Sequence, residues 1–227
     1  MTASPKHRSD GARPRADTTR RQYDRWAAVY DWVWRGYIRA TTEALLAEVQ
    51  LAPGERVLNV GCGTGGFEAR VLAGRPEQPL TGVDLSEKMI ALAREKTHRA
   101  PDARFVQADA HDLPFANASF DAVVSASVLH YLAAPAAALG EMRRVARPGG
   151  RVVVLDWCRD FRAMRWMDAL LRRVDPAHRC VFTTAELRAL LREAGLAPKR
   201  ARRVRHWWWG LMVAGARPGG SGFQVSG

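Results

Sequence analysis

The most informative chemistry in the sequence lies in a short glycine-rich segment. An apolar, β-branched run, VLNV, leads directly into Gly61, Gly63 and Gly65. Glycine lets the chain turn tightly there, and a ligand can approach the backbone because no Cβ stands in the way. The spacing is G-x-G-x-G, which differs from the G-x-G-x-x-G of dinucleotide folds. The segment therefore predicts a ligand-binding loop that follows a buried strand.

Two aspartates lie where the next two predicted strands end. Asp84 closes the run LTGVD, and a carboxylate there can accept hydrogen bonds from both ribose hydroxyls of a nucleoside. Its alternative role is to cap the following helix, which Ser86 can also do. Asp109, in QADA, can bond an adenine amino group. Because open α/β sheets bind ligands at the carboxyl ends of their strands, these positions together predict a nucleoside site.

A histidine and a tyrosine follow the fourth predicted strand. His130 and Tyr131 lie in SVLHY, and a histidine can take up or orient a proton near neutral pH. The alternative is a histidine that only packs or caps at this position, and the sequence leaves both open. Asp156 and Trp157, after the fifth strand, are further pocket candidates.

The elements that position these residues alternate between strand and helix. Helices of this length between strands imply a parallel sheet covered on both faces. The expected strands are 56–61, 80–84, 104–108, 120–126, 151–156, 197–204 and 207–216. The expected helices are 23–49, 68–73, 88–96, 136–146, 160–174 and 183–195, the fourth of which we expect Pro148-Gly149-Gly150 to stop.

Composition and charge exclude several classes of protein. No run of 18 apolar residues could span a membrane, and no apolar segment of a secretory signal opens the chain. The three cysteines lack metal-ligand spacing, so we expect no metal, and their odd number favours a cytoplasmic protein. The net charge of +12 resides in residues 1–22 (+4), 159–179 (+3) and 199–206 (+5), and the remainder is neutral. This local basicity argues against a nucleic-acid partner.

Four longer segments together resemble a known family. They are VLNVGCGTGGFEARVL, LTGVDLSEKMIALAREK, FVQADAHDLPFANASFDAVVSASVLHYL and LGEMRRVARPGGRVVVLDW. They are similar to the successive motifs of class I S-adenosylmethionine-dependent methyltransferases, in particular the ubiquinone/menaquinone-biosynthesis (methyltransferase type 11) subgroup. The segment YDRWAAVYD resembles that subgroup's first motif, whose aromatic side chain closes over the cofactor, and here supplies Tyr23 and Tyr30.

The resemblance implies a fold, a cofactor and an organisation of the chain. The fold is α/β, Rossmann-like and doubly wound, with a mostly parallel seven-stranded sheet, one antiparallel strand and a helical lid. The cofactor is S-adenosylmethionine. We expect a disordered basic tail (1–21), a methyltransferase domain (22–216) with lid elements at 22–50 and 157–183, and a flexible tail (217–227).

The resemblance also assigns roles to individual residues. The three loop glycines would face the methionine portion of the cofactor, and Asp84 would hold the ribose. The adenine would be flanked by Leu85 and Met89 and met at its edge by Asp109 and Ala110, while Ser127 would line the sulfonium.

One position departs from the family pattern. Asn59 stands where the family carries an acid that helps to hold the ammonium group of the cofactor. A neutral hydrogen bond in place of a charge-assisted one weakens binding by about 1 kcal/mol, so Asn59→Asp is expected to tighten it.

We expect the acceptor to be a small lipophilic or aromatic molecule. Aromatic residues crowd two predicted lid segments, around Trp26 to Tyr37 and Phe161 to Met167, although core packing also explains most of them. The rival interpretations are a phospholipid N-methyltransferase in peripheral contact with a membrane and a non-catalytic cofactor-binding homologue. Basic residues 199–205 followed by three tryptophans favour the former.

Overall fold

A single sheet organises the part of the chain that the computed structural model describes. That part is residues 13–100, 102–175, 177–206 and 209–219, with side chains described except for 13–30 and 200. Its seven strands are β1 (Val57–Val60), β2 (Leu80–Asp84), β3 (Ala103–Gln107), β4 (Phe120–Ala126), β5 (Ala146–Trp157), β6 (Leu196–His206) and β7 (Trp209–Pro218). They lie in the order β3-β2-β1-β4-β5-β7-β6, and only β7 runs against the others. The expected Rossmann-like fold is confirmed.

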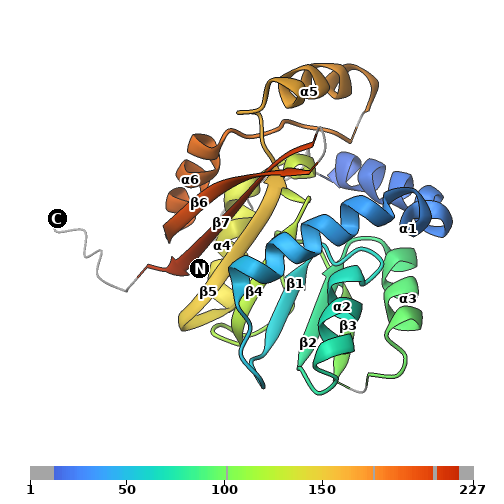
Figure 1. Cartoon of the computed structure of the whole chain (residues 1–227), viewed down its shortest axis with the longest axis vertical. Helices are drawn as coiled ribbons and strands as arrows, with labels where there is room; N and C mark the ends of the chain where they lie inside the picture. The colour runs from blue at the N-terminus through green and yellow to red at the C-terminus, as the bar shows by residue number, and fades with distance from the viewer. Residues whose placement is uncertain (1–12, 101, 176, 207–208, 220–227) are drawn as a thin grey trace, which may run out of the picture.

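Helices cover both faces of the sheet (Figure 1). On one face lie α1 (Arg13–Val49), α2 (Gly66–Gly74) and α3 (Glu87–Lys96), and on the other lie α4 (Pro135–Val145) and α6 (Thr184–Glu193). Successive strand residues belong to opposite cores: Val57 lies in the same buried cluster as Leu45 of α1, and Leu58 in the same cluster as Met142 of α4. Every residue of β1 is consequently buried, as a strand covered on both faces requires.

Local signals set several helix boundaries. The Ser86 hydroxyl accepts a hydrogen bond from the Met89 N–H and caps α3. Thr183 and Glu186 form the expected capping box of α6. The expected stop of α4 is wrong in detail, because the helix ends at Val145 and Pro148-Gly149-Gly150 belongs to β5. A register shift between Phe120 and Ala122 of β4 accommodates this extra stretch.

Part of each expected tail lies in regular structure. The first helix begins at Arg13, not at Tyr23, and Pro14 stands in its first turn, where proline is tolerated. Arg217 and Pro218 pair with Ala197 and Leu196 of β6, so they belong to the sheet. Residues 1–12 and 220–227 lie outside the described residues.

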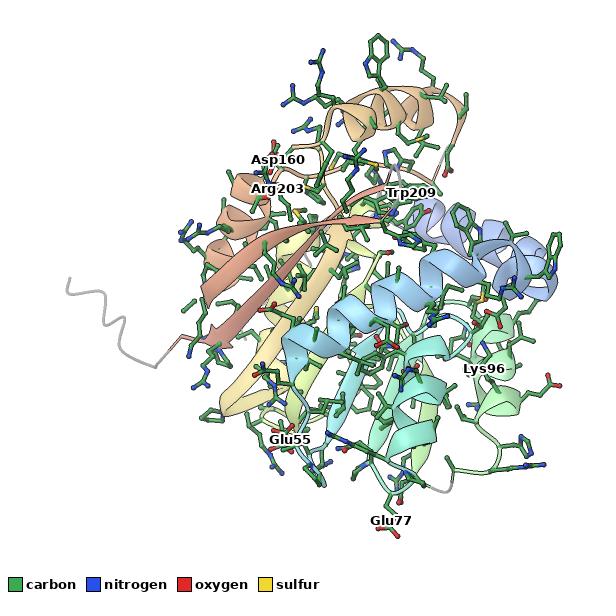
Figure 2. All side chains as sticks on the ribbon, viewed as in Figure 1. Glu55, Glu77, Lys96, Asp160, Arg203 and Trp209 are labelled. Carbon is green, nitrogen blue, oxygen red and sulfur yellow. The ribbon has the colours of Figure 1, made fainter. Side chains whose placement is uncertain are left out.

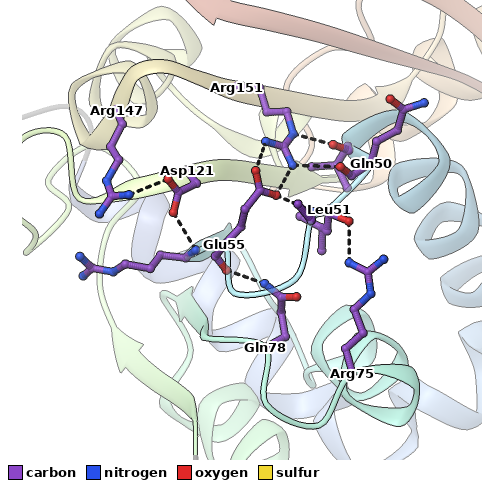
Figure 3. A network of polar contacts seen from close by, with 11 residues as sticks. Gln50, Leu51, Glu55, Arg75, Gln78, Asp121, Arg147 and Arg151 are labelled. Carbon is purple, nitrogen blue, oxygen red and sulfur yellow. Dashed lines mark hydrogen bonds and ion pairs between the residues drawn. The ribbon is translucent and has the colours of Figure 1, made fainter.

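Ion pairs lock the amino ends of the central strands (Figure 3). The Arg151 guanidinium donates to both carboxylate oxygens of Glu55, and this hydrogen bonding holds the Glu55 pKa below its usual value. Asp121 accepts hydrogen bonds from the Arg56 N–H and from Arg147. This network therefore fixes the end of the sheet opposite to the strand ends that carry the predicted site.

The remaining helix, α5 (Arg162–Val174), lies beyond the carboxyl end of β5 and the amino end of β7 (Figure 1). Its Met164 is fully buried against the core, whereas Trp166, Leu170 and Val174 are largely exposed. No helix within the described residues is long and apolar enough to cross a membrane.

Candidate active site

A cleft opens where β1, β2 and β4 end. It is an open cavity of about 820 Å³. The residues of the sequence prediction that line it are Gly61, Gly63, Asp84, Leu85, Met89, Asp109, Ala110, Ser127 and Tyr131. Three others, Asn59, Gly65 and His130, do not border the cavity. The structure thus brings most of the predicted cofactor residues together.

The three loop glycines have different functions. All have positive φ, at 76°, 53° and 74°. A Cβ on Gly61 would lie 2.2 Å from Val128, and one on Gly65 would lie 2.9 Å from the Ala93 Cβ, whereas one on Gly63 would meet nothing within 4 Å. Gly65 therefore lets the loop pack on α3, which differs from the ligand-facing role expected of it. Gly63 leaves open space for a ligand.

The Asp84 carboxylate ties the glycine loop to the start of α3. The Gly63 N–H donates to Oδ2 at 2.9 Å, and the Ser86 N–H donates to Oδ1 at 2.9 Å. These bonds orient the carboxylate at the cleft wall, and each carboxylate oxygen can accept a further hydrogen bond. The residue thus supports the start of α3 and also presents oxygen atoms to a ribose-sized ligand.

Asp109 has a partner that the sequence interpretation missed. His111 donates to its Oδ1 through the backbone N–H at 2.9 Å, and the ring Nδ1 lies 2.6 Å from the same oxygen. The hydrogen bond from His111 lowers the pKa of Asp109, and Asp109 in turn raises the pKa of His111. The D-x-H spacing was the signal available for this pair, which keeps Asp109 ionised as a hydrogen-bond acceptor.

Ser127 lies at the strained turn that follows β4. It adopts φ 61°, which is unfavourable for a residue other than glycine and is typical of functional sites. Its hydroxyl lies 2.5 Å from the Tyr37 hydroxyl, which accepts a hydrogen bond from the Trp157 indole N–H at 2.7 Å. Tyr37 therefore fastens α1 to the ends of β4 and β5, a role that aromatic composition alone did not indicate.

His130 is completely buried behind Tyr131. Its Nδ1 lies 2.6 Å from Oδ1 of buried Asp156, its ring stacks on Trp157 at 4.2 Å, and the Tyr131 ring is 4.1 Å away. Its Nε2 is buried without a hydrogen-bond partner among the described residues. The sequence named His130 and Asp156 separately, and the fold makes them a pair.

Asn59 likewise has a partner from another element. Its Nδ2 donates at 2.9 Å to Oε1 of Glu68 on α2, and both side chains are buried. Burial raises the pKa of Glu68 to about 7, against the opposing effect of this hydrogen bond. Within the described part, Oδ1 of Asn59 and Oε2 of Glu68 have no hydrogen-bond partner. Two unpartnered acceptors suit a cationic ligand group.

Tyr23 and Tyr30 lie on α1, and their side chains are outside the described residues. The adjacent Asp31 is described: it accepts hydrogen bonds from Thr64 at 2.5 Å and from Lys96. The helix that carries both tyrosines is therefore tied to the glycine loop, and their contact with the cofactor stays a prediction.

An open α/β sheet with a glycine loop and two strand-end carboxylates defines a Rossmann-like nucleoside-binding protein. Comparison with known proteins narrows this class. A family model described as a methyltransferase domain matches residues 58–154. The chain is 31% identical over 207 residues to 27-O-demethylrifamycin SV methyltransferase of Amycolatopsis mediterranei, which covers 82% of this chain and 75% of that protein. The chain belongs to the S-adenosylmethionine-dependent methyltransferase family.

Other relatives differ in how much of them the chain covers. Phosphatidylethanolamine N-methyltransferase of Cereibacter sphaeroides is 34% identical, with 70% of this chain and 78% of that protein covered. Demethylmenaquinone methyltransferase of Beutenbergia cavernae is 42% identical over 56% of this chain. The match spans only 48% of the length of that relative.

Solved structures share the fold. A chain from the complex of Haloferax volcanii Trm112 methyltransferase activator with a methyltransferase superposes with a TM-score of 0.77 at 21% identity, covering 88% of this chain and 97% of that chain.

The family defines the enzyme class as S-adenosylmethionine-dependent methyltransferase. The sulfonium of the cofactor supplies an electrophilic methyl group. The cleft residues fit the nucleoside part by their open glycine backbone and oriented carboxylates. Catalysis of such an in-line displacement rests mainly on positioning and on exclusion of water.

Proposed function

We propose that the enzyme methylates a hydroxyl group of a lipophilic or aromatic small molecule, with His130 as the proton acceptor. The observation that carries this proposal is the buried His130–Asp156 pair. A proton on Nδ1 that is donated to Asp156 leaves Nε2 as an acceptor, which is how a carboxylate sets the tautomer of a catalytic histidine. The unpartnered Nε2 supports this assignment.

Tyr131 has the complementary role in this proposal. Tyr131 lines the cleft, which His130 does not, and the two rings lie at a centroid distance of 4.1 Å. We expect Tyr131 to contact the acceptor and, by a rotamer change, to bring the acceptor hydroxyl within reach of Nε2. The cofactor contacts predicted for the other cleft residues, and for Tyr23 and Tyr30, complete the proposed site.

The chemical character of the acceptor is inferred from an aromatic cluster that a hydrogen bond from Tyr37 joins to Ser127 at the cleft wall. Trp157 and Trp209 lie 4.9 Å apart, and Tyr37 and Trp34 contact Trp209 at 5.5 and 5.9 Å. Such a cluster favours flat, apolar ligands. Two relatives of this chain support an oxygen acceptor by their names: the 27-O-demethylrifamycin SV methyltransferase and an O-methyltransferase of Penicillium expansum.

The experiment is to incubate the enzyme with tritiated S-adenosylmethionine and a cell extract, and then to partition the label. We expect label in the organic phase. His130→Gln should lower transfer by about 10²–10⁴-fold, the usual worth of a general base, while cofactor affinity stays unchanged. His98→Ala, in the exposed turn that follows α3, is the control. Equal transfer by His130→Gln would exclude His130 as the base.

A second candidate is N-methylation of a phospholipid at a membrane surface. It is favoured by α5, which exposes Trp166, Leu170 and Val174 among arginines, as helices at membrane interfaces do. The Cereibacter relative named above acts on phosphatidylethanolamine according to its name. Cosedimentation with phosphatidylethanolamine vesicles containing anionic lipid, and lipid-bound label, would favour this candidate. Absence of vesicle binding would eliminate it.

A further inference from the structure

The buried Asn59–Glu68 pair has polar atoms that its packing does not satisfy. Glu68 has no exposed surface and Asn59 is 4% exposed, yet each keeps one oxygen without a hydrogen-bond partner among the described residues. Buried acceptors normally find donors, and a carboxylate without a donor is the least favourable case. A donor from a ligand would resolve both at once.

The position of the pair indicates which ligand group that is. Neither side chain borders the cavity, but Asn59 directly precedes Val60 and Gly61, which line it. The family resemblance implies an acid at this position for the cofactor's ammonium group. An ammonium group has three N–H donors and no acceptor, so it complements two free oxygens. A neutral asparagine alone lacks the charge that this interaction requires.

We propose that Glu68 supplies the negative charge missing at position 59, so that Asn59 Oδ1 and Glu68 Oε2 together bind the ammonium group of the cofactor. In effect, the acid has moved from β1 to α2, and Asn59 holds it in place through the 2.9 Å hydrogen bond from Nδ2 to Oε1. This proposal concerns the cofactor and does not depend on the identity of the acceptor.

The surroundings of Glu68 make the interaction sensitive to pH. On α3, Lys96 stabilises the charged form of Glu68, whereas Asp84 of β2 opposes it. Cys62, in the loop after β1, stays protonated because burial and the nearby Glu68 raise the pKa of its thiol well above the usual value. On α1, Asp31 pairs with Lys96 and reduces its influence. Desolvation by burial is the largest effect and raises the Glu68 pKa to about 7.

The sign of the pH effect follows. A bound ammonium group favours the carboxylate and lowers the Glu68 pKa, so binding releases a proton wherever the free enzyme is protonated. Cofactor affinity should therefore rise with pH up to about 8 and then level off. For a free-state pKa near 7, the gain between about pH 6 and about pH 8 is about tenfold.

The test uses calorimetry of the full chain with two ligands. S-adenosylhomocysteine carries the ammonium group, whereas 5′-methylthioadenosine has the same nucleoside and thioether without it. We expect the affinity for S-adenosylhomocysteine to rise about tenfold from about pH 6 to about pH 8, and about half a proton to be released at about pH 7. The latter is measured in buffers of different ionisation enthalpy. Binding of 5′-methylthioadenosine should not change with pH.

Variants make the assignment specific. Glu68→Gln should weaken S-adenosylhomocysteine about tenfold at about pH 8, abolish the pH dependence, and leave 5′-methylthioadenosine binding intact, which also reports a folded cleft. Glu77→Gln is the matched control, because Glu77 is exposed at the lower edge of the molecule in the view of Figure 2. The proposal is overturned if Glu68→Gln binds S-adenosylhomocysteine like the unaltered enzyme, or if both ligands share the same pH dependence.

Discussion

At the scale of single residues, the polar atoms of this site depend on partners from distant parts of the chain. Asn59 is the clearest case. From the sequence alone, Asn59 lacks the negative charge that the family has at this position, and Asn59→Asp is expected to tighten cofactor binding. The structure changes this expectation, because Asn59 donates to Glu68 and a carboxylate at position 59 would face another carboxylate.

Asn59→Asp is therefore predicted to tighten cofactor binding only at acidic pH. Two adjacent carboxyl groups share one proton and retain a single negative charge well below pH 7. The variant should bind S-adenosylhomocysteine up to about tenfold more tightly than the unaltered enzyme at about pH 6, with no gain at about pH 8, where Glu68 is already ionised. Titration calorimetry at both pH values is the measurement. A gain of equal size at both would mean that Glu68 does not supply the charge.

The same glutamate should also influence stability without any ligand. Its pKa is raised from 4.5 to about 7 in the folded protein, so the native state holds a proton that the unfolded chain has lost. Stability should fall as pH rises from about 4.5 to about 7, by on the order of 3 kcal/mol at full ionisation.

Glu68→Gln should remove this dependence. In the absence of cofactor, the variant is expected to be the more stable protein at about pH 8, because a neutral amide needs no buried charge. Urea denaturation of both proteins at about pH 5 and about pH 8 measures the difference. If Glu68→Gln is less stable than the unaltered protein by the same amount at both pH values, Glu68 is not a buried acid with a raised pKa.

At the scale of elements, the sequence specified the strands well and the contacts between elements poorly. Leu80–Asp84 and Phe120–Ala126 were predicted to the residue, because apolar runs ending at polar or glycine positions define buried strands. The start of α1 could not be predicted, since residues 13–22 are polar and include proline, aspartate and two threonines, a composition typical of a tail.

The site divides in the same way. Residues at strand ends, such as Asp84 and Asp109, could be predicted because the parallel sheet alone places them together. Glu68, His111 and the pairing of His130 with Asp156 could not, because each depends on how a helix or loop packs against a strand. The different role of Gly65 likewise requires knowing that α3 approaches it.

The ion pairs at the amino ends of the strands are predicted to contribute to stability without affecting cofactor binding at the opposite end of the sheet. Arg151→Met removes the guanidinium that pairs with Glu55 and leaves that partly buried carboxylate with the Ala52 N–H as its remaining donor. We expect a loss of about 1–3 kcal/mol in the free energy of unfolding and no change in cofactor affinity. Denaturant titration and calorimetry measure the two effects. A matching loss of affinity would show that the amino-end network also shapes the cleft.

At the scale of the whole molecule, the net charge of +12 does not collect at the cleft. Much of the basicity of the body is neutralised by internal pairs such as Arg144–Glu141, Arg147–Asp121 and Arg151–Glu55. Exposed arginines lie on α5 and on the edge strand β6, where they also discourage edge-to-edge pairing. None of the described residues that line the cleft is lysine or arginine, and two are aspartates.

This distribution predicts that RNA neither accepts the methyl group nor competes for the site. A nucleic-acid substrate needs basic residues continuous across the mouth of the cleft, and its binding weakens steeply with salt. With tritiated cofactor and total RNA at physiological salt, we expect no label that ribonuclease releases, and no inhibition of transfer to the organic-soluble product. Ribonuclease-sensitive label would instead assign the exposed arginines of α5 and β6 to phosphate binding, and the acceptor would then be an RNA.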